Sequence, residues 1–238
     1  LTYLTTELGE GAVTLKDLAL GNHEFCKELE NAERPMLVLG QGPLGRPDGP
    51  NILAAARLLA SRFHFVKENW NGFNVLHTAA ARVGGMDLGV TPKTDGLSTR
   101  GMLKAAKNGD LKALYLLGAD EIDMSVLGET FVIYQGHHGD RGAHRADVVL
   151  PGAAYTEKSG YYVNTEGRPQ MGLAATRPPG DAREDWAILR ALSEALGYTL
   201  PYDNISELRK MMIAVAPHFA NLDSVEPAIW EEFGEFNN

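Results

Sequence analysis

Four short runs of residues are apolar throughout, without the alternation of apolar and polar side chains that marks a half-exposed strand. They are Met36–Leu39, Leu114–Leu117, Phe131–Tyr134 and Val148–Leu150. Continuous apolar runs of this length are typical of strands that are buried on both faces of a parallel sheet. Because segments with helical spacing separate the runs, we expect an α/β fold with a doubly wound, mainly parallel sheet and flanking helices.

Three helices are predicted between the first two of these runs. The first begins near Pro50, because proline is favoured in the first turn of a helix. A second is expected at residues 73–83. The third has Ser98 as its N-cap and ends at Gly109, since serine and glycine are favoured at these two positions.

Short strands and two C-terminal helices are predicted after the fourth run. The strands are expected at residues 161–163 and 171–176. The helices are expected at residues 183–196 and from Ile205 onward, with Asn204 as the N-cap of the second helix.

The first of these two helices carries a tryptophan that we expect to be buried. Asp181 is expected to cap the helix and Glu184 to lie in its first turn, where the helix dipole favours a carboxylate. Trp186 would then face inward beneath the loop 146–168. Its replacement by alanine would cost about 3–5 kcal/mol, the usual cost of removing a large buried side chain.

Composition and charge exclude several classes of protein. The chain has 238 residues, of which 44% are hydrophobic, so it can fold without disulfides or metals. Its single cysteine, Cys26, can neither pair within the chain nor supply the four thiolates of an iron–sulfur cluster. A formal charge of −9 argues against a nucleic-acid surface, which needs a basic stripe, and no apolar run approaches the length of a membrane span.

Three regions are expected along the chain. Residues 1–30 are interpreted as an N-terminal extension from an absent upstream region, because the chain begins at Leu1 and not at methionine. Residues 31–222 are expected to form the α/β domain. Residues 223–238 are an acidic tail in which no lysine or arginine balances the carboxylates, and we interpret it as solvated or covered by a partner.

A glycine-rich loop is the first candidate binding site. Gly40, Gly42 and Gly45 match the G-x-G-x-x-G pattern of dinucleotide-binding loops, and Glu68 lies at the distance expected of a ribose-binding acid. However, Pro43 removes one backbone N–H from this loop, and further breaks delay the start of the next helix. The glycines remain candidates for cofactor binding, but a tight turn at the strand end is favoured.

A histidine pair is the candidate metal site. His137 and His138 are adjacent, and Asp140 and His144 could complete a ligand set. Adjacent side chains point apart in an extended chain, whereas zinc ligands are usually separated by two to four residues. The residues remain metal candidates, but a loop in which the imidazoles bond to the backbone or to neighbours is favoured.

The polar loop after the fourth apolar run is the third candidate, because α/β proteins usually place a binding site where a buried strand opens into a loop. Its polar side chains are those of Tyr155, Glu157, Lys158, Asn164, Glu166 and Arg168. They could make a catalytic set, or a pairing network that fixes the loop, since buried polar groups must be hydrogen-bonded. Sequence spacing leaves both interpretations open.

Two longer stretches resemble one family. FVIYQGHHGDRGAHRADVVLPGAAYTEKSGYYVNTEGRPQ and RPPGDAREDWAILRALSEALGYTLPYD closely resemble the large iron–sulfur (75-kDa) subunit of respiratory complex I. The wider ADVVLP…E…G…N.EGR pattern is that of the molybdopterin oxidoreductase superfamily, while QGHHGD and AREDW point to the complex I branch. Residues 31–222 are thus similar to part of the molybdopterin-oxidoreductase-like domain of that subunit, toward its C-terminus.

The resemblance implies a non-catalytic structural part of the peripheral, NADH-oxidising arm of complex I. Electron transfer from NADH to ubiquinone would be carried out by cofactors on other chains or regions. Iron–sulfur clusters are then expected on a missing N-terminal region or a companion chain, with no cofactor and no molybdenum on this chain. The alternative is an oxidoreductase that itself binds molybdopterin or a nicotinamide dinucleotide.

The implied partners are other complex I subunits, especially the cluster-bearing N-terminal part of the same subunit and the flavin-bearing subunits. No nucleic acid and no membrane insertion are expected. The implied location is the matrix side of the mitochondrial inner membrane, or the cytoplasmic face of a bacterial plasma membrane.

Carboxylates after the second apolar run argue against a bound pterin. Asp120, Glu121 and Asp123 would repel a pyrophosphate placed beside them. The six polar loop residues, together with Trp186, are therefore expected to be structural or interface residues, and no catalytic residue is expected.

Overall fold

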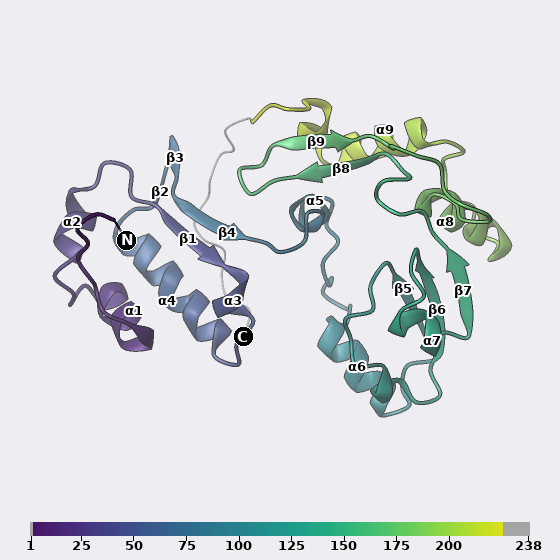
Figure 1. Cartoon of the computed structure of the whole chain (residues 1–238), viewed down its shortest axis with the longest axis horizontal. Helices are drawn as coiled ribbons and strands as arrows, with labels where there is room; N and C mark the ends of the chain where they lie inside the picture. The colour runs from purple at the N-terminus through teal and green to yellow at the C-terminus, as the bar shows by residue number, and fades with distance from the viewer. Residues whose placement is uncertain (1, 226–238) are drawn as a thin grey trace. The chain divides into compact units, whose positions relative to one another are not determined.

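The computed structural model describes residues 2–225, and these form two compact units (Figure 1). Unit 1 contains the described residues up to Val83, the segment Val163–Arg168 and residues 224–225. Unit 2 contains Gly84–Tyr162 and Pro169–Asp223. Most of the acidic tail expected at 223–238 lies outside the described residues.

Unit 1 is built around a pair of parallel strands. Its helices are α1 (Gly11–Leu20), α2 (Cys26–Asn31), α3 (Gln41–Leu44) and α4 (Gly49–Arg62), and its strands are β1 (Leu37–Gly40), β2 (Val66–Lys67), β3 (Trp70–Asn71) and β4 (Phe73–Leu76). Strands β1 and β4 pair in parallel, with Leu37 opposite Phe73, and β2 and β3 form a short antiparallel hairpin. The parallel register brings the carboxyl ends of β1 and β4 to the same edge.

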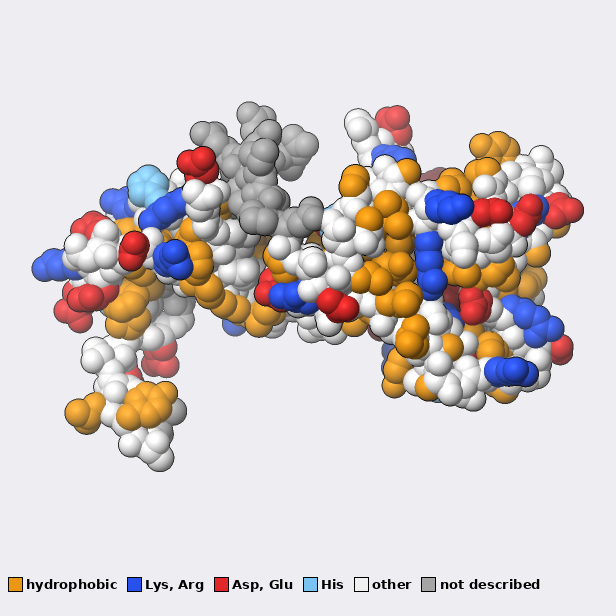
Figure 2. All heavy atoms as spheres, turned by 90° about the horizontal axis from the view of Figure 1, so that it is seen from above, with side chains coloured by type: hydrophobic (Ala, Val, Ile, Leu, Met, Phe, Trp, Pro, Cys, Tyr) orange, Lys and Arg blue, Asp and Glu red, His pale blue; other side chains and the backbone are white. Residues whose placement is uncertain are grey.

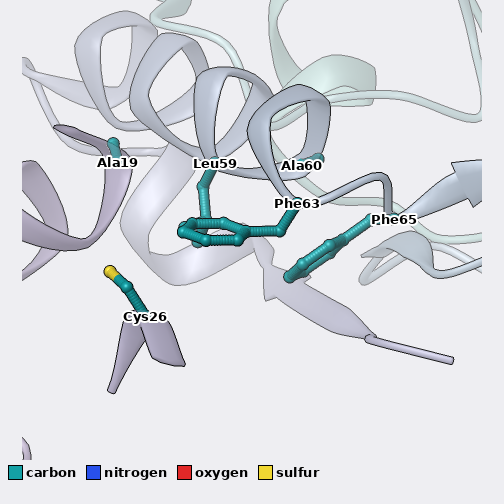
Figure 3. Packing of buried hydrophobic residues seen from close by; sticks show 6 residues of the cluster. All are labelled: Ala19, Cys26, Leu59, Ala60, Phe63 and Phe65. Carbon is teal, nitrogen blue, oxygen red and sulfur yellow. The ribbon is translucent and has the colours of Figure 1, made fainter. Parts of the chain in front are cut away.

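The core of unit 1 lies around α4 (Figure 3). Its buried residues are Ala19, Cys26, Leu59, Ala60, Phe63 and Phe65. Leu37 and Phe73 pack against this cluster from one face of the β1–β4 pair. Helices α1 and α2 therefore share their core with α4, and the Cys26 thiol lies 3.7 Å from the carbonyl oxygen of Leu18.

Unit 2 is built around three parallel strands. The helix α5 (Arg82–Asp87) leads into it, followed by α6 (Thr99–Lys107), β5 (Ala113–Leu117), the 3-10 helix η1 (Met124–Leu127), β6 (Phe131–Gly136), α7 (Arg141–Arg145) and β7 (Val148–Pro151). The strand order is β5-β6-β7, with every pair parallel. A buried cluster of Ala106, Leu116, Leu127, Val132 and Tyr134 packs one face of this sheet against α6 and η1.

A hairpin and two further helices follow the sheet. They are β8 (Gly160–Val163), β9 (Pro169–Gly172), α8 (Asp185–Ala195), α9 (Ile205–Val215) and the 3-10 helix η2 (Pro217–Ala220). The Asn204 side chain caps α9 by accepting a hydrogen bond of 3.0 Å from the Glu207 N–H. The Ser98 side chain likewise caps α6 through the Gly101 N–H, at 3.2 Å. Both predicted caps are confirmed.

The predicted fold class is confirmed, since parallel sheets are flanked by helices and followed by short strands and two helices. The described parallel strands nevertheless lie in two sheets, β1-β4 and β5-β6-β7, one in each unit. The helix predicted at 73–83 is wrong, because residues 73–76 form β4 and only Arg82 and Val83 are helical. The side chain of Phe73 packs against the unit 1 core, and this tertiary contact overrides the helical spacing.

The N-terminus of α8 also differs from the prediction. The helix begins at Asp185 with Glu184 as its N-cap residue, so Asp181 does not cap it. Trp186 is only partly buried; its ring packs edge-on against Tyr202, with centroids 6.4 Å apart, and its indole N–H donates to Glu184. The expected burial of Trp186 is therefore only partial, and alanine at this position should cost less than the ~3–5 kcal/mol of a fully buried side chain.

Candidate functional site

The candidate site of unit 2 lies at the carboxyl ends of its parallel strands, where open α/β sheets bind ligands. Leu117 of β5 is opposite Gln135 of β6, and Gln135 is opposite Leu150 of β7. The polar loop begins directly after β7, so the sheet places it beside these strand ends. The position expected of the loop is thus observed, and its chemistry depends on what its side chains contact.

Gln135 is the centre of a buried polar network. It is 0% exposed, its amide nitrogen donates to the Asp185 Oδ1 at 2.8 Å, and its amide oxygen accepts from the Tyr115 hydroxyl. The other oxygen of Asp185 accepts from the Lys158 ammonium group. Asp185 lies in the first turn of α8, where the helix dipole favours a negative charge. One carboxylate therefore joins the sheet, the loop and the helix.

Backbone hydrogen bonds hold the start of the loop in an extended conformation. The Gly152 N–H donates to the Gly136 carbonyl at 2.8 Å, which continues the ladder beyond β7. The Arg183 N–H donates to the Pro151 carbonyl at 3.1 Å, and the Arg183 carbonyl accepts from the Ala153 N–H at 2.8 Å. The segment before α8 is thus bonded to the loop as a short parallel bridge.

Within the loop, Glu157 and Tyr155 differ in their surroundings. The Glu157 carboxylate accepts a 2.9 Å hydrogen bond from the Ala154 N–H, which closes a local turn. Tyr155, by contrast, is exposed. Glu157 and Lys158 thus hold the loop, whereas Tyr155 is available for contact with another molecule, and its interface role stays a prediction.

The three remaining loop residues form a separate turn, in a segment that belongs to unit 1. The Asn164 side-chain oxygen accepts from the N–H groups of Glu166 and Arg168, at 3.1 and 3.0 Å. The Glu166 carboxylate accepts from the Arg168 guanidinium at 2.8 Å and from the Asn164 side-chain amide at 3.2 Å, and these two bonds lower the pKa of Glu166. Gly167 has a φ of 86°, a left-handed conformation that glycine adopts without strain. The N-T-E-G-R sequence is therefore a hairpin turn.

The buried polar side chains in and around this loop are paired within the protein. Among the described residues, no buried side-chain nitrogen or oxygen lacks a hydrogen-bond partner. Lys158 and Glu157 are predicted from the sequence, whereas Gln135, Tyr115 and Asp185 are not. A glutamine at the end of a buried strand is nevertheless a signal that a polar partner must be present. The arrangement suits a network that fixes the loop.

Carboxylates gather at the same edge of the sheet, around Tyr134. Burial raises the pKa of Tyr134, and the charges of Asp120, Asp140 and Glu121 raise it further. Asp120 and Glu121 follow β5, and Asp140 follows β6. A pyrophosphate at these strand ends would meet the same negative charges, so these carboxylates do not fit a pterin dinucleotide.

Asp123, the third carboxylate expected there, has a different role. Its Oδ1 accepts hydrogen bonds from the Ser125 N–H at 3.0 Å and the Ser125 hydroxyl at 2.6 Å, so it caps η1. These hydrogen bonds lower the pKa of Asp123. Asp123 therefore acts as a local cap of η1.

We expect Tyr115 and Tyr134 to ionise above the ordinary tyrosine pKa of about 10. Burial raises the pKa of both, and for Tyr115 the charge of Asp185 adds to it. The pKa of each tyrosine is thus higher in the folded chain than in the unfolded chain. The contribution of these tyrosines to the free energy of unfolding is therefore fully present below pH ~10 and is lost as the pH rises through their folded-state pKa values. Absorbance titration of tyrosinate in native and urea-unfolded chain measures this shift.

Phenylalanine variants assign the titration to these two residues. Tyr115→Phe and Tyr134→Phe should each remove part of the high-pH component of the native titration, because burial raises the pKa of both tyrosines. Equal midpoints in the native and unfolded chain would contradict the expected shift.

The candidate metal ligands lie in an exposed loop. His137 and His138 contact each other edge-on, with ring centroids 4.6 Å apart, and His144 lies on α7. All three side chains are exposed. Within residues 2–225, no group of three or more histidine, cysteine or acidic side chains is placed to hold a metal ion. The structure therefore places these histidines as surface residues.

The glycine-rich loop of unit 1 forms a short turn. Gly40 precedes the four-residue helix α3, and the Gly45 N–H donates to the Gln41 carbonyl at 2.8 Å. The long helix α4 begins only at Gly49. A dinucleotide loop needs free N–H groups at the start of the following helix, so Gly40, Gly42 and Gly45 do not fit that pattern.

Comparison with known proteins identifies the relatives of this chain. The family model described as molybdopterin oxidoreductase matches residues 1–195. The NADH-ubiquinone oxidoreductase 75 kDa subunit of Reclinomonas americana is 44% identical over 95% of this chain and 32% of the relative. The NADH dehydrogenase [ubiquinone] iron-sulfur protein 1, mitochondrial, of Solanum tuberosum is 43% identical over 93% of this chain and 29% of the relative.

A bacterial relative matches over the whole chain. This NADH-quinone oxidoreductase subunit, from Rickettsia bellii (strain RML369-C), is 40% identical over 100% of this chain and 33% of the relative. The chain thus spans about a third of the length of the curated relatives that it matches. Among the described residues, no helix has the length and apolar character needed to cross a membrane.

Proposed function

The chain belongs to the molybdopterin oxidoreductase family, and from this premise we propose that it is a non-catalytic structural part of the NADH-oxidising arm of respiratory complex I. The similarity to three complex I subunits, at 40–44% identity over nearly the whole chain, carries this proposal. These relatives come from mitochondria and from a bacterium, and their names place them in one enzyme complex.

The geometry of the polar loop supports a structural role. A catalytic acid, base or nucleophile must reach a substrate, and its pKa must suit the reaction. Here the Lys158 ammonium group and the Asp185 carboxylate bind each other, and Asp185 also binds the buried Gln135. These groups stabilise the junction of β7, the loop and α8, which suits a scaffold.

The carboxylates at the strand ends and the single cysteine support the proposal that this chain binds no redox cofactor of its own. The carboxylates Asp120, Glu121 and Asp140 disfavour a pyrophosphate at the strand ends of unit 2. The single cysteine, Cys26, is buried among apolar side chains of unit 1. We propose that the iron–sulfur clusters of the complex are bound by cysteines outside these 238 residues.

The proposed partners are the cluster-bearing part of the same subunit and the flavin-bearing subunits of the arm. The proposed location is the matrix face of the mitochondrial inner membrane, or the cytoplasmic face of a bacterial plasma membrane. Both follow from the relatives, which include mitochondrial and bacterial complex I subunits.

Isolation of the tagged chain from its native host tests this function. After mild detergent extraction, we expect the chain to be recovered in stoichiometric amounts with other complex I subunits, in a fraction that oxidises NADH. The same tag on an unrelated protein of the host is the control. Recovery of the chain alone, with the NADH-oxidising activity in other fractions, would overturn the proposal.

The alternative function is an oxidoreductase that binds molybdopterin or a nicotinamide dinucleotide, and family membership is the observation that favours it. Elemental analysis and cofactor extraction of the purified native chain separate the two functions. Stoichiometric molybdenum, or an extracted pterin or nicotinamide dinucleotide, would support the alternative and contradict a scaffold without a cofactor.

A further inference from the structure

The dipeptide Asn-Gly occurs twice in the sequence, as Asn71-Gly72 in unit 1 and as Asn108-Gly109 in unit 2. An asparagine before a glycine can lose its side-chain nitrogen without an enzyme. The backbone nitrogen of the glycine attacks the side-chain carbonyl carbon, and glycine favours this attack because it has no Cβ to block a close approach. The dipeptide is the same at both sites, so the surroundings of each site decide whether it reacts.

Asn71-Gly72 is enclosed by backbone. The Asn71 side-chain oxygen accepts a hydrogen bond from the Phe73 N–H at 3.0 Å, and the Gly72 N–H donates to the Phe65 carbonyl at 2.7 Å. A Cβ placed on Gly72 would lie 2.1 Å from the Pro35 carbonyl oxygen. The side chain and the attacking nitrogen are thus both held, and the cyclic imide that the reaction forms has no room.

Asn108-Gly109 lies at the exposed C-terminus of α6. Both residues are exposed, and Asn108 is the C-cap. Among the described residues, the Asn108 side chain has no hydrogen-bond partner. Gly109 has a φ of 79°, and beyond its chain neighbours no atom lies within 4 Å of the place that a Cβ would take on it. The side chain and the following peptide unit therefore have room to form the imide.

One backbone hydrogen bond holds the attacking nitrogen of this second site. The Gly109 N–H donates to the Ala106 carbonyl at 3.0 Å, and Asn108 has a ψ of −8°, so the reaction requires this bond to break and ψ to rotate. Helix ends fray at a low cost in free energy, whereas a segment packed against a core opens only together with its surroundings. The bond at Gly109 therefore delays the reaction far less than the enclosure of Gly72 does.

We propose that Asn108 is a site of spontaneous deamidation, and that the fold protects Asn71 from the same reaction. The Gly109 nitrogen bonds to the side-chain carbonyl carbon of Asn108, the C–N bond of the amide breaks, and ammonia leaves with the proton of the Gly109 nitrogen. Water then opens the cyclic imide at either carbonyl, so that residue 108 becomes aspartate or isoaspartate. The inference goes beyond the proposed function, because water is the sole co-reactant.

The product changes the end of α6. It places a negative charge at the C-terminus of a helix, where the helix dipole disfavours it. Acidic and basic side chains are interspersed on the face that Figure 2 shows, so the effect depends on the nearest groups in the chain. Asp110 adds a like charge, while Lys104 and Lys107 in the last turn oppose it. Isoaspartate also lengthens the backbone, so we expect the 2.9 Å hydrogen bond from the Asp110 N–H to the Ala105 carbonyl to be lost.

Peptide mapping by mass spectrometry tests the proposal. The chain, isolated from its host with any subunits that accompany it, is incubated at mildly alkaline pH in water enriched in heavy oxygen. Water that opens the imide labels the new carboxylate, which separates this reaction from conversion before isolation. We expect Asn108 to convert at least about tenfold faster than Asn71, because Asn71 reacts only when its surroundings open.

Two controls assign the difference to the fold and to Asn108. In urea the surroundings of both sites are lost, so Asn71 should convert at a rate close to that of Asn108. The variant Asn108→Gln has a longer side chain that does not close the same ring, so it should abolish the label at position 108 and leave Asn71 unchanged. In the converted chain, amide exchange at Asp110 should be faster than in the unconverted chain.

Two results would overturn the proposal: an Asn108 that stays unlabelled in the folded chain, or equal conversion of Asn108 and Asn71 in the folded chain. A label that persists in the same peptide of the Asn108→Gln variant would show that another residue reacts, which also contradicts it. None of these results bears on the proposed function, because recovery of the chain with complex I subunits is measured separately.

Discussion

Replacing Gly72 by alanine is expected to lower the free energy of unfolding of unit 1 by about 3 kcal/mol. A methyl group on Gly72 would lie 2.1 Å from the Pro35 carbonyl oxygen and 2.9 Å from the Phe65 carbonyl oxygen. Both contacts are with backbone atoms and cannot be relieved by rotating a side chain. The Gly72 N–H and carbonyl are also bonded to Phe65 and Leu37, each at 2.7 Å, so movement of this segment breaks the sheet.

Urea unfolding followed by circular dichroism measures this effect. Gly42→Ala is the matched control, because a methyl group on Gly42 would meet no atom within 4 Å. The control should change the free energy of unfolding by less than about 0.5 kcal/mol, or stabilise the chain slightly. If both variants unfold at the urea concentration of the unmodified chain, the close approach at Gly72 is wrong.

The strands of this fold are largely readable from the sequence, because continuous apolar runs of this length are typical of parallel strands. The expected burial on both faces is wrong for the described residues, since Val38, Val148 and Val149 are exposed. The runs at Met36–Leu39 and Phe131–Tyr134 became β1 and β6 with their ends displaced by one or two residues. Their distribution between two sheets was not readable, since strand pairing depends on contacts between residues far apart in the sequence. The helix predicted at residues 73–83 is wrong for the same reason, because pairing with β1 makes residues 73–76 a strand.

The caps show where local sequence is sufficient and where it fails. The Asn204 cap of α9 is local, since it needs only the backbone N–H of Glu207 three residues later. Asp181 also has the right residue type, but the backbone bridge between Arg183 and Gly152 keeps the preceding segment extended and delays the helix to Asp185. A contact across the fold therefore set the start of α8.

The polar loop lies at the sheet edge that the sequence predicts, but Gln135 and Asp185, which its network contains, were missed. A loop after a buried strand, at the carboxyl edge of a parallel sheet, is predictable from strand order. The side chains that hold this loop in place are not predictable from strand order, because Gln135 and Asp185, which are hydrogen-bonded at 2.8 Å, are 50 residues apart in the sequence. For Asn164, Glu166 and Arg168 the sequence left two interpretations open, a catalytic set and a pairing network. The structure shows a pairing network whose hydrogen bonds all lie within one five-residue stretch.

The polar network should respond to the loss of its shared carboxylate. We expect Asp185→Ala to lower the free energy of unfolding of unit 2 by about 2–3 kcal/mol, because a buried amide donor and an ammonium group both lose their acceptor. Asp185→Asn should cost less, since one oxygen still accepts from Gln135 while the ion pair with Lys158 is lost. Asp181→Ala, at an exposed position of the same segment, is the control.

Two measurements on these variants separate a scaffold from a catalyst. In Asp185→Ala, amide exchange should accelerate at Ala153 and Ala154, whose N–H groups are bonded to Arg183 and Glu157 in the intact loop. If the proposed scaffold function holds, complexes that assemble with the variant should be fewer but should oxidise NADH with unchanged turnover, because the network then serves only to hold the loop in place. If the complexes form in normal amounts and their turnover falls, the network takes part in catalysis and the scaffold function is wrong.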